Sequence, residues 1–209
     1  MSTIEISSGY EAILTFCLHF QFRWMGDHWK QEIASVGGCE AIPRIWSIEG
    51  LVSDDAPIRP ASPAYQILSI DQQRPDLTTA RLEGRAGPHH YSGRLTFEEK
   101  ADEVVINVEV IDRCTNVGKP LTATYLIESS SGHLHPDHDS SVRITWPHPD
   151  THLVFEADPP ARVEAQEAGM GTIRLKAVVE PDPSAKVQTL HYRWRWITTP
   201  GHQIWNRDV

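Results

Sequence analysis

The chain has 209 residues, with 19 Lys and Arg against 28 Asp and Glu, which gives a net charge of −9 at pH 7. This length suits one large all-β domain and is enough to bury a core without disulfide bonds. Because the excess negative charge repels phosphate groups, nucleic acids and anionic membranes are excluded as expected partners.

The cysteine content and the N-terminus indicate a reducing compartment. Three cysteines, Cys17, Cys39 and Cys114, are too few and too scattered for a disulfide framework, and no C-x-x-C pair is present. The first twelve residues lack the basic and apolar regions of a signal peptide, and no segment approaches the ~18 apolar residues of a membrane span. We therefore expect a cytoplasmic protein with no membrane partner.

The clearest secondary-structure signal lies near the N-terminus, in residues 16–24. Apolar side chains occupy every second position from Phe16 to Trp24, with Cys, His, Gln and Arg between them. Alternation of this kind predicts a half-buried strand, because successive side chains of a strand point to opposite faces. The sequence Met25 to His28 is typical of a turn and leads into a second strand at Trp29–Val36, so the pair is expected to form a hairpin.

Further strands are predicted along the rest of the chain, separated by clusters of Gly, Pro and Asn. Proline cannot donate to a strand ladder and glycine supplies unusual backbone angles, so such clusters mark turns. Regularly spaced strands predict an all-β, antiparallel β-sandwich or flattened barrel of ten or more strands, with little helix. The predicted strands are Arg44–Leu51, Tyr65–Ile70, Thr78–Arg85, Tyr91–Glu98, Val104–Cys114, Leu121–Glu128, Val142–Trp146, Leu153–Ala157, Thr172–Glu180 and Val187–Thr198.

Few segments favour anything other than strand. A single helical turn is expected near Pro63–Tyr65 or in Ala161–Ala168, and an exposed loop at Ser53–Ser62, which is rich in proline and aspartate. No segment has the composition of a linker, so residues 1–209 are predicted to form a single domain.

Two segments resemble each other. Residues 18–24 are LHFQFRW and residues 190–196 are LHYRWRW, and each precedes a short turn with Gly and His and then a Trp. The similarity is explained either by two internally related halves or by convergence of aromatic strands. We expect the two strands to lie near one another in the fold.

The polar faces of these two strands form the first candidate site. If both strands lie in one sheet, they present a basic surface on which arginines bind an anion bidentately and aromatic rings stack on it. An R-x-R strand resembles those of the triphosphate tunnel enzymes, but their N-terminal E-x-E-x-K is absent here. The alternative is that the arginines pair with the surplus carboxylates. The candidate ligand-binding residues are His19, Arg23, His191, Arg193 and Arg195.

A histidine-rich segment, HLHPDHD at residues 133–139, forms the second candidate site. An H-x-H pair on a strand places both imidazoles on one face, where they suit a divalent transition metal, and the candidate metal ligands are His133, His135 and His138. This segment resembles the first metal motif of cupins, and His202 to Asn206 resembles the second, which implies a metal-dependent enzyme of cupin-like form. The alternative is a polar hairpin tip at Ser129–Ser141 that needs no cofactor.

Motifs of the common enzyme classes are missing. The sequence has no G-x-S-x-G, P-loop, dinucleotide fingerprint or H-E-x-x-H, and Cys39 alone does not indicate a nucleophile. Carboxylates such as Glu98 and Asp112 are candidates for a pair in a cleft.

Together these features favour a non-enzymatic binding or protein-interaction module, for an anionic ligand, a carbohydrate or another protein. The alternatives are the cupin-like metal enzyme and a structural domain that forms a homo-oligomer through an aromatic edge strand.

Overall fold

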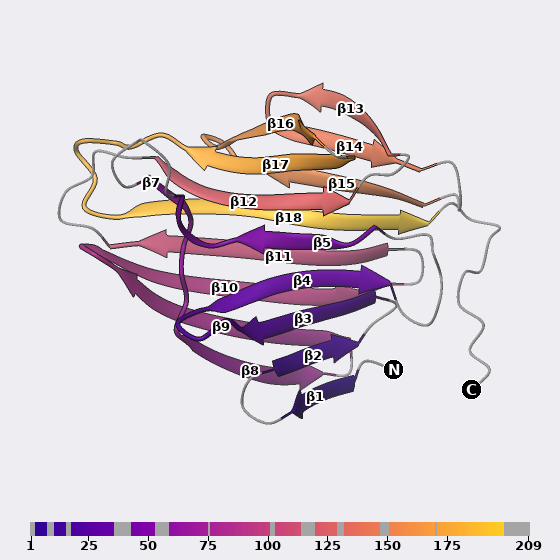
Figure 1. Cartoon of the computed structure of the whole chain (residues 1–209), viewed down its shortest axis with the longest axis horizontal. Helices are drawn as coiled ribbons and strands as arrows, with labels where there is room; N and C mark the ends of the chain where they lie inside the picture. Colours follow the sequence, from indigo (N-terminus) through magenta and orange to yellow (C-terminus); the bar gives the residue numbers. More distant parts are fainter. Residues whose placement is uncertain are drawn as a thin grey trace.

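The computed structural model describes residues 3–7, 11–15, 18–35, 43–52, 59–74, 76–100, 103–113, 120–128, 132–146, 151–169 and 171–198. These residues form two antiparallel sheets of eight strands each and a small sheet of two strands (Figure 1). No helix is found among them, so the prediction of an all-β fold is confirmed. Accordingly, the described residues include no helix long and apolar enough to cross a membrane.

The first sheet contains the N-terminal strands and three strands from the second half of the chain. Its order is β1-β2-β3-β4-β5-β12-β17-β16. The strands are β1 (Thr3–Ser7), β2 (Glu11–Thr15), β3 (Leu18–Trp24), β4 (Trp29–Ser35), β5 (Ile45–Ile48), β12 (Leu121–Glu128), β17 (Thr172–Val179) and β16 (Arg162–Gly169).

The second sheet has the order β13-β14-β15-β18-β11-β10-β9-β8. Its strands are β13 (His133–His138), β14 (Ser141–Thr145), β15 (Thr151–Ala157), β18 (Gln188–Thr198), β11 (Glu103–Asp112), β10 (His89–Glu99), β9 (Leu77–Ala86) and β8 (Ile67–Arg74). The two-stranded sheet consists of β6 (Gly50–Val52) and β7 (Arg59–Ser62).

Alternating sequence produces one buried and one open face in each sheet. In β3, Leu18, Phe20 and Phe22 are at most 1% exposed, whereas the residues between them face outward. In β18, Trp194 and Trp196 are likewise buried. Burial of one face explains why register is specified strongly, since a slip by one residue would turn every apolar side chain to solvent.

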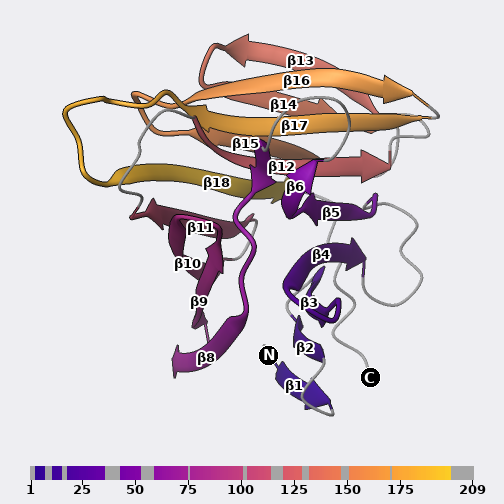
Figure 2. The same cartoon turned by 60° about the vertical axis from the view of Figure 1, so that its left-hand side comes forward.

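The buried faces of the two sheets pack against each other, as Figure 2 shows by the facing layers of β1–β5 and β8–β11. Aromatic pairs cross the interface: the ring centroids of Phe20 and Phe97 lie 4.8 Å apart, and those of Tyr125 and Trp194 lie 4.9 Å apart at nearly a right angle. Edge-to-face pairs of this kind stabilise a core beyond the apolar area that they bury. The structure is therefore a β-sandwich, as predicted.

The structure differs from the local expectations at four places. The expected helical turn at Ala161–Ala168 is the edge strand β16, and the region around Pro63–Tyr65 is an extended segment without helix. Strand β7 occupies the end of the expected loop at Ser53–Ser62, and β13 occupies the expected hairpin tip at Ser129–Ser141. In each case pairing with a neighbouring strand, such as that of β16 with β17, overrides a local sequence rich in turn-forming or helix-forming residues.

Candidate active site

Polar side chains gather between the two sheets, near the end of the sandwich where β11 ends and β10 and β12 begin. Figure 1 shows where these strand ends lie. They come from both sheets and from the segment before β8. Such a cluster is unusual in the interface of a sandwich, because polar groups are costly to bury without partners. Its members are Gln31, Ser47, Glu49, Ser62, Tyr65, His89, Asp112, Tyr125 and Tyr192.

Glu49 follows β5 and is the carboxylate of this cluster that lies beside the tyrosines. Its Oε1 accepts hydrogen bonds from the Ser47 hydroxyl and, at 3.4 Å, from the backbone N–H of Gln31. Burial raises the pKa of Glu49 to about 7, and these bonds together with the charges of His28 and Lys30 oppose that rise only in part. Near neutral pH the group therefore exists in both protonation states, which is the condition for efficient proton transfer.

Three tyrosines surround the inner side of this carboxylate. The hydroxyls of Tyr125 and Tyr192 lie 2.6 Å apart, and the Tyr125 hydroxyl donates to Gln31 Oε1 at 3.1 Å. Burial raises the pKa of Tyr65, of Tyr125 and of Tyr192, so all three remain protonated donors. The cavity among these groups has a volume of about 10 Å³, the size of one water molecule.

The extended segment Ser62–Tyr65 crosses this end of the sandwich and is held in place by backbone contacts. Thr124 N–H donates to the Ser62 hydroxyl at 2.5 Å, and Trp29 N–H donates to the Tyr65 carbonyl at 2.8 Å. Glycine is required beneath it: a Cβ on Gly84 would overlap the Ala64 carbonyl. The absence of two side chains in β9 and β10, at Gly84 and Gly93, thus lets the segment lie against the second sheet.

On the other side of this segment His89 pairs with Asp112. The His89 Nδ1 and Asp112 Oδ2 atoms are 2.7 Å apart, and the His89 ring stacks on Tyr91 at 5.6 Å between centroids. Asp112 is 3% exposed, and its Oδ1 has no hydrogen-bond partner among the described residues. A buried carboxylate that bonds Nδ1 of an imidazole in this way fixes the orientation of the ring. The other ring nitrogen, Nε2, is then left for another partner.

The two centres are neighbours. Ser62 and Pro63 line both the cavity beside Glu49 and a second cavity of about 10 Å³ beside His89 and Asp112. Burial is the main cause of the raised pKa of Tyr65, and the charges of Glu49 and Asp112 both raise this pKa further. A carboxylic acid that titrates near neutrality and an oriented imidazole therefore flank one short segment, an arrangement suited to general acid–base chemistry.

The structure separates the residues of the predicted basic surface. His19 and Arg23 lie on the outer face of the first sheet, whereas His191, Arg193 and Arg195 lie on the outer face of the second. Because the buried faces of the sheets meet, these outer faces point in opposite directions. The single surface expected from the LHFQFRW and LHYRWRW strands does not form, and whether either half binds a ligand stays a prediction.

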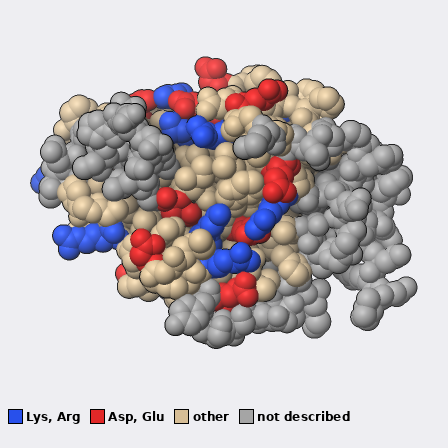
Figure 3. Space-filling view, in the orientation of Figure 1, with Lys and Arg blue, Asp and Glu red and all other residues tan. Residues whose placement is uncertain are grey.

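Arginines of these faces are paired with carboxylates. Arg195 Nε lies 2.5 Å from Glu103, and Arg193 bonds both Glu156 at 3.0 Å and Asp158 at 2.7 Å. Figure 3, which views the molecule from the side of the first sheet, likewise shows Lys and Arg next to Asp and Glu there. This pairing is the alternative that the sequence left open for the arginines.

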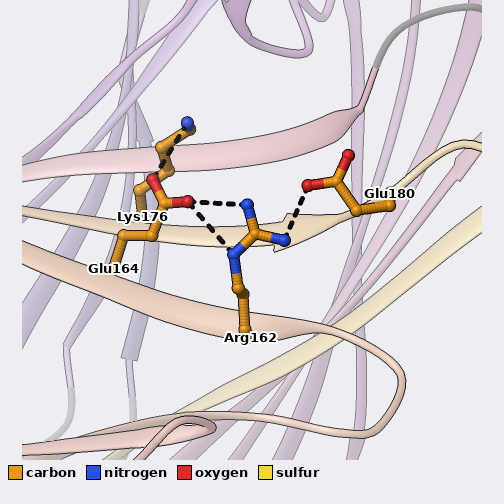
Figure 4. Close-up of polar contacts among 4 residues, drawn as sticks. All are labelled: Arg162, Glu164, Lys176 and Glu180. Carbon is orange, nitrogen blue, oxygen red and sulfur yellow. Dashed lines mark hydrogen bonds and ion pairs between the residues drawn. The ribbon is translucent and has the colours of Figure 1, made fainter.

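A similar network lies on β16 and β17 (Figure 4). Arg162 bridges Glu164 at 2.9 Å and Glu180 at 2.6 Å, and Lys176 bonds Glu164 at 3.2 Å. All four side chains are at least one-third exposed, so the network is a solvated surface feature.

The histidine-rich segment forms the edge strand β13. His133 and His135 line a groove at the rim of the sandwich, whereas His138 is exposed beyond a register shift at Pro136/His138. Within the part of the chain that the structure describes, no three His, Cys, Asp or Glu side chains are arranged to hold a metal ion. Cys39 and the second cupin-like motif, His202 to Asn206, lie outside the described residues.

The sequence did not single out Glu49 or His89, and the pair of Glu98 and Asp112 that it offered does not form. Asp112 lies opposite Tyr91 and contacts His89, whereas Glu98 lies opposite Val105 near the other end of the same two strands. No fixed spacing relates residues 49, 89 and 112, because they meet through sheet pairing. The only sequence signal for these residues was their position, a carboxylate or imidazole at the end of a strand. Many exposed residues of the chain share that position.

Comparison with known proteins gives a fold and no family. No known protein-family profile matches the sequence, and no curated protein sequence matches it. Among solved structures, the chain is similar to an Escherichia coli K12 protein described as a "putative aldose 1-epimerase", with a TM-score of 0.53 and 11% identity over 94% of this chain and 99% of that one. It is also similar to a mutant of the heparan sulfate lyase HepC from Pedobacter heparinus, with a TM-score of 0.51 and 8% identity over 93% of this chain and 37% of the lyase.

These likenesses define the architecture as an aldose-epimerase-like β-sandwich. They contradict the expected non-enzymatic binding or interaction module, because the solved structures that share this fold are described as an aldose 1-epimerase and a heparan sulfate lyase. That expectation rested on the lack of linear motifs, and a sandwich brings polar groups together from separate strands without any such motif.

Proposed function

We propose that the chain is a carbohydrate-related enzyme that moves protons at the anomeric centre of a sugar, with Glu49 as a proton-transfer group. The observation that supports this most is the pKa of Glu49, about 7, in a buried cluster of hydroxyl donors. The likeness of the sandwich to the protein described as an aldose 1-epimerase supports the choice of substrate class.

The reaction needs one base and one acid. In the interconversion of sugar anomers, a base takes the proton of the anomeric hydroxyl while an acid protonates the ring oxygen, which opens the ring. Closure on the other face of the carbonyl returns both protons, so no electrons are gained or lost and no cofactor is required. In our proposal Glu49 acts as the base, and His89, oriented by Asp112, acts as the acid.

The present cavities hold only about one water molecule each. In our proposal the Ser62–Pro63 segment between the cavities moves to admit a sugar, which requires the hydrogen bond from Thr124 N–H to the Ser62 hydroxyl to break. Closure of the segment over the bound sugar would exclude water and strengthen the hydrogen bonds inside the site.

The charges of the chain favour a neutral sugar over an acidic polysaccharide. The net charge is −9, and Arg193 and Arg195 already bond carboxylates. A polyanion such as heparan sulfate would meet repulsion over most of the surface. A small neutral sugar in a reducing cytoplasm is thus the partner and the location that we propose. The homo-oligomer expected from the sequence stays a prediction, which light scattering would test.

The proposal is tested by the rate at which freshly dissolved α-D-glucose and α-D-galactose approach anomeric equilibrium, followed by polarimetry. We expect the wild-type chain to accelerate at least one of them, and Glu49→Gln to reduce the acceleration by about 100-fold or more, as loss of a general base does. Glu83→Gln, which changes an exposed glutamate of β9, is the matched control and should keep the full rate.

Two outcomes would contradict the proposal. One is a wild-type rate equal to that of buffer for both sugars. The other is full activity in Glu49→Gln, which would remove Glu49 from the reaction even if the enzyme class were right.

A further inference from the structure

A groove of about 590 Å³ lies at the rim of the sandwich, between the β13–β14 hairpin and the β16–β17 hairpin. Side chains of His133, His135, Glu167 and Thr172 line it, together with backbone of the adjacent glycines. Its volume falls within the ~300–1,000 Å³ typical of small-molecule sites, and it greatly exceeds the two water-sized cavities near Glu49.

The local backbone directs these groups toward one space. His133 and His135 are two residues apart on β13, so their rings project from the same face of the strand. On the facing strand β16, the register shifts between Glu167 and Gly169, and such bulges re-aim the side chains beside them. Gly169 has φ of +81°, a conformation that glycine adopts without strain and that closes the hairpin under the groove.

Hydrogen-bonding capacity in the groove is largely unused. Within the described part of the chain, the Glu167 carboxylate and the His133 ring have no hydrogen bond or ion pair, while His135 Nε2 lies 3.0 Å from the Thr145 hydroxyl. A carboxylate accepts bonds from two hydroxyls, and a neutral imidazole both donates and accepts. No Lys or Arg side chain among the described residues lines the groove. Its hydrogen-bonding groups therefore match a neutral ligand rich in hydroxyl groups.

We infer that this groove is a saccharide-binding site, separate from the site around Glu49. A lone metal ion would leave most of the volume empty, and the described residues offer no three-ligand cluster to hold one. An anion would be repelled by Glu167. The choice of a saccharide rests in part on the proposed function, because it extends the same substrate class to a second position.

The two sites are far apart. Thr172, in the groove, begins β17, and Val179 at its end pairs with Leu121, which lines the cavity beside His89 and Asp112. The seven residue steps from Thr172 to Val179 span about 23 Å in a strand. One monosaccharide cannot bridge this distance, so the groove binds its ligand independently of the acid–base groups.

The test measures saccharide binding in the absence of turnover. Maltose, cellobiose and lactose are titrated into the Glu49→Gln protein while the backbone amide signals of Thr172 and Ile173 are followed by NMR. We expect at least one disaccharide to shift these signals saturably. His133→Ala and Glu167→Gln should each weaken that binding about five- to tenfold, the effect of one lost hydrogen bond. His138→Ala, on the same strand but outside the groove, should bind as before.

The outcomes separate the two proposals. Saturable binding that depends on His133 and Glu167 supports the groove even if no sugar is turned over. Equal affinity of all the variants, or no saturable shift with any of the three disaccharides, overturns it. A single Zn²⁺ bound per chain and lost in His133→Ala, without disaccharide binding, also overturns it and assigns the groove to a metal. Because these side chains are exposed, circular dichroism should show folded variants.

Discussion

The near-neutral pKa of Glu49 makes the stability of the fold depend on pH in an unusual direction. The folded pKa is about 7 and the ordinary value is 4.5, a difference of about two and a half pH units. Each unit corresponds to about 1.4 kcal/mol, so the charged carboxylate costs the folded state about 3 kcal/mol once both states have lost the proton. Replacement of Glu49 by Gln removes that charge while it keeps the shape and a hydrogen-bonding oxygen.

The sign of the effect follows from proton binding. Between pH 4.5 and 7 the folded chain keeps a proton on Glu49 that the unfolded chain has released. The contribution of this group to the free energy of unfolding is therefore fully present below pH 4.5 and is lost as the pH rises through 7. We expect Glu49→Gln to match the wild type near pH 4 and to exceed it by about 3 kcal/mol at pH 8.

Urea denaturation at pH 4, 5, 6, 7 and 8, followed by tryptophan fluorescence, measures this difference. The comparison uses the gap between the two proteins at each pH, because other groups titrate equally in both. Glu83→Gln serves as the control and should run parallel to the wild type, since its side chain is exposed. A gap between wild type and Glu49→Gln that stays constant from pH 4 to 8 would refute the reasoning, because it would mean that Glu49 has an ordinary pKa.

Four further substitutions test how this end of the sandwich is held. Tyr125→Phe removes a buried hydroxyl that bonds two partners, and urea denaturation should show a loss of about 1–3 kcal/mol. Gly84→Ala should lower the melting temperature more than Gly93→Ala, because the new Cβ meets rigid backbone at Gly84 but only the Tyr65 ring at Gly93. An equal loss in the two variants would argue against the close packing of the crossing segment. Arg162→Ala should cost less than about 1 kcal/mol in spite of its two carboxylate partners, since the network is exposed, and a loss of several kcal/mol would contradict that view.

Much of the fold was predictable because strand periodicity is a local property. The alternation in LHFQFRW and LHYRWRW places Leu18, Phe20 and Phe22 on one face and Tyr192, Trp194 and Trp196 on another, and all six are buried. Edge strands were less predictable. β13 and β16 contain proline, glycine and charged residues, and they are strands because a partner strand supplies hydrogen bonds on one side.

The candidate site was far less predictable. The arginines of β3 and β18 looked like one basic surface only under the assumption of a shared sheet, and the strand order places them in different sheets. Glu49, His89 and Asp112 carry no motif, and each resembles many other polar residues of the chain.

The sequence by itself determined the class of the fold, the apolar face of each strand and the acidic surface that disfavours polyanions, because each depends on residue type and local spacing. Only the tertiary structure decided which strands share a sheet. It thereby decided that the polar faces of the two aromatic strands point outward in opposite directions. It also decided how strongly Glu49 is desolvated, which raises its pKa to about 7. The physical reason is that desolvation depends on everything packed around a group, and residues far apart in the sequence supply that packing.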